Sequence, residues 1–454
     1  MTDPGLRDPS ADVSLNWARR LMGTTARVDA PAAASEGRIV RVVGLALEAR
    51  GLSALIGDQC EVTDPQGRTF EAEVVGFSEE ATYLMPLETT QGVGPGCRVK
   101  NLGAASRVPM GEQLLGRVLD ARGRPIDDGE RLTGDASVNL HGRPINPLKR
   151  REITEPLDVG VRAINALMTV GRGQRMGIFA GSGVGKSVLL GMMTRYTRAQ
   201  IIVVGLVGER GREVAEFVSE ILDDEARARA VVVAAPADSS ALMRLHGANL
   251  ASSIAEHFRD QGFDVLLLMD SLTRYAQAQR EIGLAIGEPP ATKGYPPSVF
   301  AHLPKLVERA GNSENRQGSL TAFYTVLVEG DDLNDPVADA ARAILDGHIV
   351  LSREIAERGR FPAIDVEASI SRLMPKLVDP DHLSLMRRFK ELAATYRENR
   401  DLIAVGAYRR GQDARLDRVI DIQPDLEAFL SQPMNEPADM ASSIDALVDL
   451  LHSD

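Results

Sequence analysis

The stretch Ala180-Gly181-Ser182-Gly183-Val184-Gly185-Lys186-Ser187 follows an apolar run, residues 176–180, and precedes a helical pattern. A glycine-rich loop between a strand and a helix is the context that a phosphate-binding loop requires. Glycines let backbone N–H groups converge on phosphate oxygens, and the start of the helix adds partial positive charge. We predict that residues 181–187 bind nucleotide, that Lys186 reaches the β- and γ-phosphates, and that Ser187 binds Mg²⁺. The strict GxxxxGK[ST] pattern is broken at one position, where Ala180 replaces glycine.

Strands and helices alternate along the chain on both sides of this loop. Further apolar runs, interpreted as strands, occupy residues 201–208, 231–235, 265–269 and 320–328. Nearly continuous apolar runs are typical of parallel strands that are covered on both faces. The pattern therefore predicts an α/β fold with a largely parallel sheet around the phosphate loop.

Two of these strands end in charged side chains. Glu209 and Arg210 follow the strand at residues 201–208, and Asp270 follows the strand at residues 265–269. In α/β sheets, ligands bind at the carboxyl ends of the strands. We predict that Glu209 orients or activates water, that Arg210 contacts the γ-phosphate and that Asp270 binds Mg²⁺ through water. Asp270 is also a candidate cap for the next helix, and both roles can coexist.

The composition narrows the class of partner. The chain has 454 residues, a net charge of −12 and 4% aromatic residues with one Trp. Such a chain is a poor match for nucleic acid, which needs basic grooves and stacking rings. The charge is also segregated, since residues 421–454 hold eight acidic residues and no Lys or Arg, whereas residues 160–200 hold six Lys or Arg residues and no acidic ones. The loop region therefore suits polyphosphate, and the acidic tail suits contacts with partners.

Cysteine usage and hydropathy indicate the compartment. The two cysteines, Cys60 and Cys97, cannot build a disulfide framework, and the sequence contains no metal-ligand cluster of Cys or His. No signal peptide is evident, and the longest apolar runs are far shorter than a membrane span. We expect a soluble, cytoplasmic protein that can still dock on a membrane machine.

The length and the local patterns predict about three domains. Short alternating runs between turns, from residue 38 to residue 100, indicate a small β-barrel or sandwich. Helical periodicity runs through residues 383–405 and again through residues 426–451. The predicted units are an amino-terminal segment, helical or frayed (1–27), a β-barrel domain (28–100), an ATPase domain (101–374) and a carboxy-terminal helical domain (375–454).

Longer motifs carry a resemblance to a known family. They are Gly171–Arg175, the Glu209 cluster, Asp270–Tyr275, Gly287–Ser298 and Leu345–His348. With these motifs the chain resembles the type III export ATPases, relatives of the catalytic subunits of rotary ATP synthases, from about residue 38 onward. Within the family it is most similar to the flagellum-specific members. The discriminating stretches are Leu84–Glu88, Ala180–Ser182, Val328–Asp332 and Asp335–Pro336.

The resemblance implies a cytoplasmic homohexamer with a β-barrel crown, a RecA-like P-loop ATPase ring and a carboxy-terminal helical domain that faces the export gate. It implies Mg²⁺-dependent ATP hydrolysis that energises the handling of export substrates and chaperones at that gate. It further implies that residues 1–27 bind a stator-like regulatory protein or the membrane surface, with peripheral association at the inner membrane.

The resemblance implies the roles given above for the phosphate loop and the charged strand ends, and it adds two residues. Arg372 matches the arginine finger that a neighbouring subunit supplies, and Phe361 matches an adenine-stacking position where relatives commonly have Tyr. Arg353 is the competing candidate for the finger. A finger acting in trans contributes on the order of 10³-fold in rate, so assembly and activity would be linked.

Three alternative functions remain open at this point. Injectisome ATPases share much of the nucleotide site. A Rho-like hexameric nucleic-acid translocase shares the ring but needs a basic, aromatic surface, whereas residues 1–100 carry a net charge of −4. A non-catalytic ring subunit would lack the water-activating carboxylate that Glu209 provides.

Overall fold

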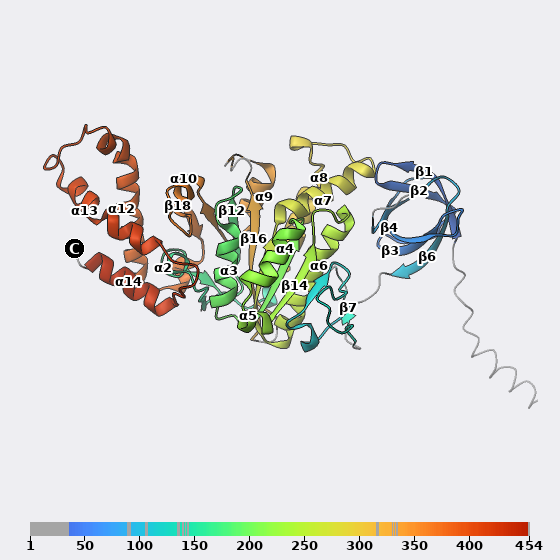
Figure 1. Cartoon of the computed structure of the whole chain (residues 1–454), viewed down its shortest axis with the longest axis horizontal. Coiled ribbons are helices and arrows are strands. Elements are labelled where there is room, and N and C mark those ends of the chain that lie inside the picture. Colours follow the sequence, from blue (N-terminus) through green and yellow to red (C-terminus); the bar gives the residue numbers. More distant parts are fainter. Residues whose placement is uncertain are drawn as a thin grey trace, which may run out of the picture. The chain divides into compact units, whose positions relative to one another are not determined.

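The computed structural model of the chain is drawn in Figure 1. It describes residues 36–452, apart from 89–91, 105–107, 134–136, 139, 141, 143–144, 315–316, 329, 331 and 333–334. The predicted amino-terminal segment, residues 1–27, lies outside the described residues. The chain divides near residue 105 into two compact units, which are described separately.

The first unit is a closed barrel of six antiparallel strands in the spatial order β1-β2-β5-β4-β3-β6. Its strands are β1 (Glu36–Val43), β2 (Ala46–Arg50), β3 (Asp58–Thr63), β4 (Thr69–Phe77), β5 (Thr82–Pro86) and β6 (Arg98–Ala104). Alternate residues point inward and form a core that includes Ile39, Leu47, Val62, Val74 and Val99. Of the two predicted forms, the barrel is confirmed, and its closure leaves no free sheet edge.

The second unit is built on an eight-stranded sheet with the order β18-β17-β12-β16-β15-β13-β14-β8. All neighbouring strands are parallel except β17 and β18. The strands are β8 (Val118–Asp120), β12 (Arg175–Ala180), β13 (Ile201–Val207), β14 (Ala230–Ala235), β15 (Asp264–Asp270), β16 (Ser319–Leu327), β17 (Gly347–Leu351) and β18 (Ile364–Ser371). The five predicted strands are confirmed, with bounds that differ by one residue at most.

Helices cover both faces of this sheet, and the burial of consecutive strand residues shows why (Figure 1). In β13, Ile202 and Val204 pack into one apolar cluster, while Ile201 and Val203 pack into a second cluster on the opposite face. Burial of each such aliphatic side chain, relative to leaving it exposed to water, stabilises the folded state by about 1.5–3 kcal/mol. The first cluster includes α2 (Arg162–Leu167), α3 (Lys186–Tyr196) and α5 (Asp224–Ala228), and the second includes α6 (Ala241–Gln261), α7 (Leu272–Ala285), α8 (Pro297–Val307) and α9 (Pro336–Ile344).

Short elements complete the connections of the second unit. They are β7 (Val108–Pro109), β9 (Ser137–Val138), β10 (Pro156–Leu157), β11 (Val170–Gly171), α4 (Gly211–Glu216), α10 (Arg353–Glu357), α11 (Met374–Leu377) and the single turns η1 (Glu112–Leu114), η2 (Pro147–Lys149), η3 (Phe217–Ile221) and η4 (Thr292–Gly294).

Three helices end the chain: α12 (Pro380–Ala404), α13 (Ala414–Leu430) and α14 (Met440–His452). They confirm the predicted helical end of the chain, but the prediction of one helical stretch over residues 426–451 is wrong. Two prolines lie in the break at residues 431–439, and proline disfavours a helical residue before it. The Gln432 side chain also bonds to the backbone of Arg162 and Gly160, which ties the break to the start of α2.

Candidate active site

The predicted phosphate loop lies between β12 and α3, at the carboxyl end of the sheet. Gly183 and Gly185 have φ angles of 78° and 86°, a left-handed conformation that glycine adopts without strain. Gly185 precedes the first turn of α3, and no side chain caps that helix. The first N–H groups of a helix have no partner within the helix. They are therefore available to an anion at the loop.

Lys186 brings the loop together with two neighbouring strand ends. Its Nζ lies 2.6 Å from Asp270 Oδ1, at the end of β15, and 3.2 Å from Glu209 Oε1, just after β13. The register explains the convergence, because β13 pairs in parallel with β15 and Leu206 lies opposite Asp270. All three side chains are at most 13% exposed. The structure thus brings together the lysine and the two carboxylates predicted for this site.

Burial and mutual charge shift the pKa values of this cluster. Burial, followed by the charge of Asp270, raises the pKa of Glu209 to about 7 against the opposing effect of Lys186. Burial disfavours the charged form of Lys186, but the two carboxylates outweigh it and raise the Lys186 pKa. One ammonium group, that of Lys186, therefore pairs with two carboxylates. Glu209 holds a proton more readily than an ordinary glutamate.

Sequence reasoning did not single out Glu213 in α4 as a partner of Glu209. The hydrogen bond between the two carboxyl groups helps raise the Glu209 pKa and is the first cause of a lowered Glu213 pKa. The signal in the sequence was the spacing of four residues between Glu209 and Glu213 at the start of a helix. Side chains four residues apart on a helix lie on the same side, so the two carboxyl groups could have been expected to meet.

The other predicted residues near the loop have different environments. Ser187 is exposed in the first turn of α3. Ser271, rather than Asp270, caps α7, because its side chain accepts a bond from the Arg274 backbone. The Arg210 side chain is 79% exposed and pairs with Glu213 at 3.7 Å. In this arrangement Arg210 points to solvent instead of toward Lys186.

Phe361 lies beside the phosphate loop although 174 residues separate it from Ser187. A Cβ atom added to Gly185 would lie 3.3 Å from Phe361 Cδ1, so the ring packs against the loop backbone. Phe361 is 43% exposed, and its carbonyl accepts a bond from the Gln432 backbone N–H. Phe361 is therefore partly exposed next to the loop.

Strand register separates the two candidate finger residues. Leu351 of β17 pairs with Ala180 at the loop, whereas Ser371 of β18 pairs with Gly347 at the opposite end of β17. Arg372 therefore lies at the amino end of the sheet, about 13 Å along the strand direction from the loop. Arg353 begins α10 just after β17 and lies at the loop end.

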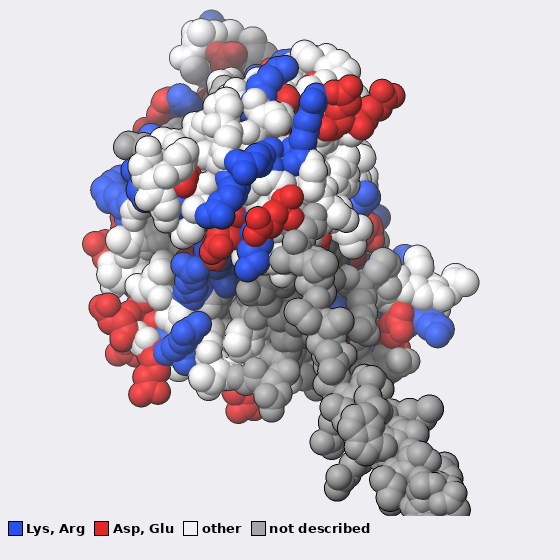
Figure 2. Space-filling view, turned by 90° about the vertical axis from the view of Figure 1, so that its right-hand side faces the viewer, with Lys and Arg blue, Asp and Glu red and all other residues white. Residues whose placement is uncertain are grey.

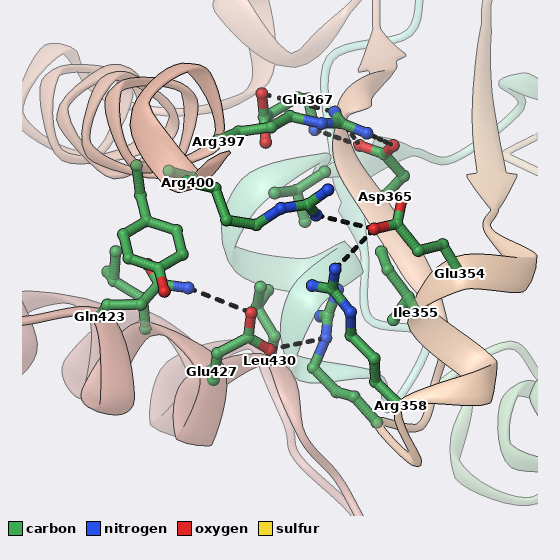
Figure 3. A pocket seen from close by; sticks show the side chains of 15 residues that line it. Glu354, Ile355, Arg358, Asp365, Glu367, Arg397, Arg400, Gln423, Glu427 and Leu430 are labelled. Atoms are coloured by element: carbon green, nitrogen blue, oxygen red, sulfur yellow. Dashed lines mark hydrogen bonds and ion pairs between the residues drawn. The ribbon is translucent and has the colours of Figure 1, made fainter. Parts of the chain in front are cut away.

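A charged pocket lies where α10 and β18 meet α12 and α13, and Figure 3 shows its lining. It encloses about 80 Å³, less than the 300 Å³ or more of a typical ligand site. Its arginines are already paired with carboxylates: Arg358 and Arg400 with Glu354, Arg360 with Glu427, and Arg397 with Asp365 and Glu367. We interpret the pocket as part of a network of ion pairs that joins the segment around Phe361 to the carboxy-terminal helices.

The described residues contain no group of three or more His, Cys, Asp and Glu side chains arranged to hold a metal ion. Within the same part of the chain, every helix is too short or too polar to cross a bilayer.

Comparisons with known proteins agree with this geometry. Residues 160–371 match the nucleotide-binding domain of the ATP synthase alpha/beta family, residues 39–103 its beta-barrel domain, and residues 378–449 the T3SS EscN ATPase C-terminal domain. The chain is 59% identical to the flagellum-specific ATP synthase of Pseudomonas aeruginosa over 96% of its own length and 98% of that protein.

Two solved structures are also similar to this chain. One is the assembled ATPase EscN of the enteropathogenic E. coli type III secretion system, with a TM-score of 0.86 and 43% identity over 91% of this chain and all of that one. The other is EscN in complex with its central stalk EscO, with a TM-score of 0.83 and 42% identity over the same shares.

Proposed function

The chain belongs to the ATP synthase alpha/beta family of ATP-hydrolysing P-loop enzymes, and from that premise we propose that its Mg²⁺-dependent ATP hydrolysis energises flagellar type III protein export. One observation carries the chemical part of the proposal. Lys186 at the mouth of the phosphate loop lies within 3.2 Å of both Glu209 and Asp270. A cation for phosphate, a carboxylate for water and a carboxylate for the metal are the parts that phosphoryl transfer to water needs.

Each residue has a role in this proposal. Lys186 leaves its carboxylate partners for the β- and γ-phosphates, while the backbone of residues 181–187 holds the phosphate oxygens. Glu209, once freed of its proton, orients the attacking water. Arg210 would turn inward to contact the γ-phosphate, and the Phe361 ring would stack on adenine. The phenolic hydroxyl common in relatives is absent here, but stacking requires only the ring face.

The donor set fits Mg²⁺. The ion prefers oxygen ligands and keeps several waters, so one or two protein oxygens beside a phosphate are sufficient. The Ser187 hydroxyl and the Asp270 carboxylate are such oxygens. When bound, Mg²⁺ would neutralise charge that develops on the phosphate oxygens.

We further propose a homohexamer in which Arg372 acts on the nucleotide of a neighbouring subunit. The register supports this choice, because Arg372 lies at the end of β18 away from its own phosphate loop. Its guanidinium donates a bond to the Arg342 carbonyl, and the residue is exposed. An exposed arginine remote from its own site suits a role across a subunit interface.

The proposed partners follow from family membership. They are a central stalk, as EscO is for EscN, a stator-like protein at residues 1–27, the export gate, and export substrates with their chaperones. We place the protein in the cytoplasm, peripherally associated with the export apparatus at the inner membrane. Nucleic acid is not among these proposed partners. Figure 2 shows acidic side chains beside the basic ones on the drawn face.

A role in an injectisome is the second candidate, because the similarity to EscN extends over 91% of the chain. The higher identity to a flagellum-specific relative favours the flagellum. Expression in a flagellated strain that lacks its own export ATPase would decide between the two: restored motility supports the flagellar role. Restored injectisome secretion without motility would reverse the assignment.

Mixing two inactive variants tests the ring mechanism. Glu209→Gln retains the finger but lacks the water-orienting carboxylate, and Arg372→Ala retains the carboxylate but lacks the finger. Interfaces between the two types of subunit should regain ATP hydrolysis, measured as phosphate release from the mixture against each variant alone. If co-assembled variants stay inactive, Arg372 does not act in trans.

A further inference from the structure

A buried hydroxyl group lies beside the Asp270 carboxylate on the neighbouring strand. Thr325 belongs to β16, which pairs in parallel with β15, and the pairing of Met269 with Tyr324 places Thr325 level with Asp270. Thr325 is fully buried, and its Oγ1 lies 2.6 Å from Asp270 Oδ1. A hydroxyl buried in an apolar strand needs such a partner, because an unpaired one is costly.

The two oxygens of Asp270 are used differently. Oδ1 accepts both the Thr325 hydroxyl and the Lys186 ammonium group, each at 2.6 Å. Within the described part of the chain, Oδ2 accepts no hydrogen bond from a side chain or backbone group. Hydrogen bonds to one oxygen fix the orientation of a carboxylate and leave the other oxygen for a ligand.

We propose that Thr325 is a positioning residue that holds Asp270 with Oδ2 toward the metal–nucleotide site. This inference rests on the proposed function, in which Lys186 leaves Asp270 for the phosphates. At that step Thr325 is the donor that remains on Oδ1, and it keeps the carboxylate from rotating. Thr325 touches neither substrate nor metal and acts through Asp270.

The same strand supplies a matched control. Thr321 is also buried in β16, four residues closer to the amino end, and its hydroxyl accepts a bond from the Gly173 N–H at 2.8 Å. Thr321→Val and Thr325→Val remove the same group from the same strand. Only the second variant touches Asp270, so effects on β16 packing and effects on the carboxylate can be separated.

Metal binding is the first readout. The full chain is titrated with Mn²⁺ in the presence of a non-hydrolysable ATP analogue, and free Mn²⁺ is followed by electron paramagnetic resonance. Thr325→Val should raise the Kd for Mn²⁺ about 10- to 100-fold, whereas Thr325→Ser and Thr321→Val should bind as the wild type does. Unchanged Mn²⁺ affinity in Thr325→Val, or an equal loss in Thr321→Val, would overturn the proposal.

A thermal-melting cycle in the absence of nucleotide and metal is the second readout. Thr325→Val should lower the Tm of the wild type but not that of Asp270→Ala, because the hydroxyl then has no carboxylate to hold. An equal fall in both backgrounds would show that Thr325 acts by packing alone. If the wild type bound the analogue with no dependence on Mn²⁺, the proposed function would fail, while the cycle would still decide whether Thr325 holds Asp270.

Discussion

The two ends of the eight-stranded sheet both bury charged side chains, but they pair them differently. At the carboxyl end, one ammonium group, Lys186, lies between two carboxylates. At the amino end, Arg309 pairs with Glu256 through two bonds of 3.0 and 2.6 Å. Arg309 also donates to the Ser253 hydroxyl and the Leu140 carbonyl. Charge is balanced one to one in the Arg309–Glu256 pair and is unbalanced in the Lys186 cluster.

The difference indicates what each cluster does. A bidentate pair with its remaining N–H groups bonded holds two elements together, and a ligand gains little by displacing it. The Lys186 cluster instead contains a carboxyl group, Glu209, whose pKa is raised to about 7 by burial and by the charge of Asp270. Perturbed groups of this kind are concentrated at functional sites. The comparison therefore supports the proposed ligand exchange at the Lys186 cluster and is consistent with structural support by the Arg309–Glu256 pair.

Removing Lys186 should have the largest effect on turnover. Lys186→Ala deletes the cation proposed for the phosphates, and loss of one such group lowers kcat by at least about 100-fold. It also leaves two buried carboxylates without a counter-ion. We expect ATP hydrolysis, measured as phosphate release, to fall to background, with a lower Tm at pH 8. The exposed Lys376 in α11 supplies the control, since Lys376→Ala should change neither quantity. Normal turnover in Lys186→Ala would remove the phosphate-loop assignment.

Glu209→Gln should cause the second-largest loss of turnover, because it keeps the shape of the side chain and removes only the base. We expect kcat to fall by about 10² to 10⁴-fold, the usual contribution of a positioned base. Binding of a fluorescent ATP analogue should persist. Glu225→Gln, at an exposed position in α5, is the matched control. A near-normal kcat in Glu209→Gln would place the water-orienting group elsewhere.

The raised pKa of Glu209 also predicts how the stability of the same variant depends on pH. The folded chain holds the Glu209 proton up to about pH 7, whereas an unfolded glutamate loses it near pH 4.3. Between these values the folded state binds more protons, so stability falls as pH rises, by at most about 1.4 kcal/mol per pH unit. Glu209→Gln removes this loss. In urea unfolding, the free energy of unfolding of Glu209→Gln should therefore rise relative to that of the wild type from pH 5 to pH 8. A difference between the two that does not change with pH would contradict the pKa shift.

Local patterns were sufficient to predict the parts of the fold that depend on neighbouring residues. The phosphate loop and the five apolar strands have strong local signals, because continuous burial leaves a run of aliphatic residues. Strands β8, β17 and β18 were missed: the first spans only three residues, the second only five, and the third is interrupted by polar side chains. The break between α13 and α14 was missed because helical periodicity was extended across two prolines.

The site was predictable where charge follows a strand, and not where a contact depends on register between distant strands. Glu209 and Asp270 could be placed near Lys186 from the rule that ligands bind at the carboxyl ends of strands. The Thr325 contact needed the pairing of β15 with β16, which no local pattern contains. No local pattern contains the contact between Phe361 and Gly185 either, because it depends on the pairing of β17 with β12.

Removing Arg309 should have the smallest effect on turnover and a large effect on stability. Arg309→Met leaves Glu256 as a buried carboxylate without its bidentate partner, and breaking such a pair destabilises a protein by about 3 to 5 kcal/mol. We expect a lower urea midpoint, while kcat per folded molecule stays within about twofold, because the pair lies at the end of the sheet away from the phosphate loop. Arg309→Met with Glu256→Leu should recover much of the lost stability, since the second change removes the uncompensated charge. A kcat that fell in parallel with Lys186→Ala would show that the two ends of the sheet act as one site.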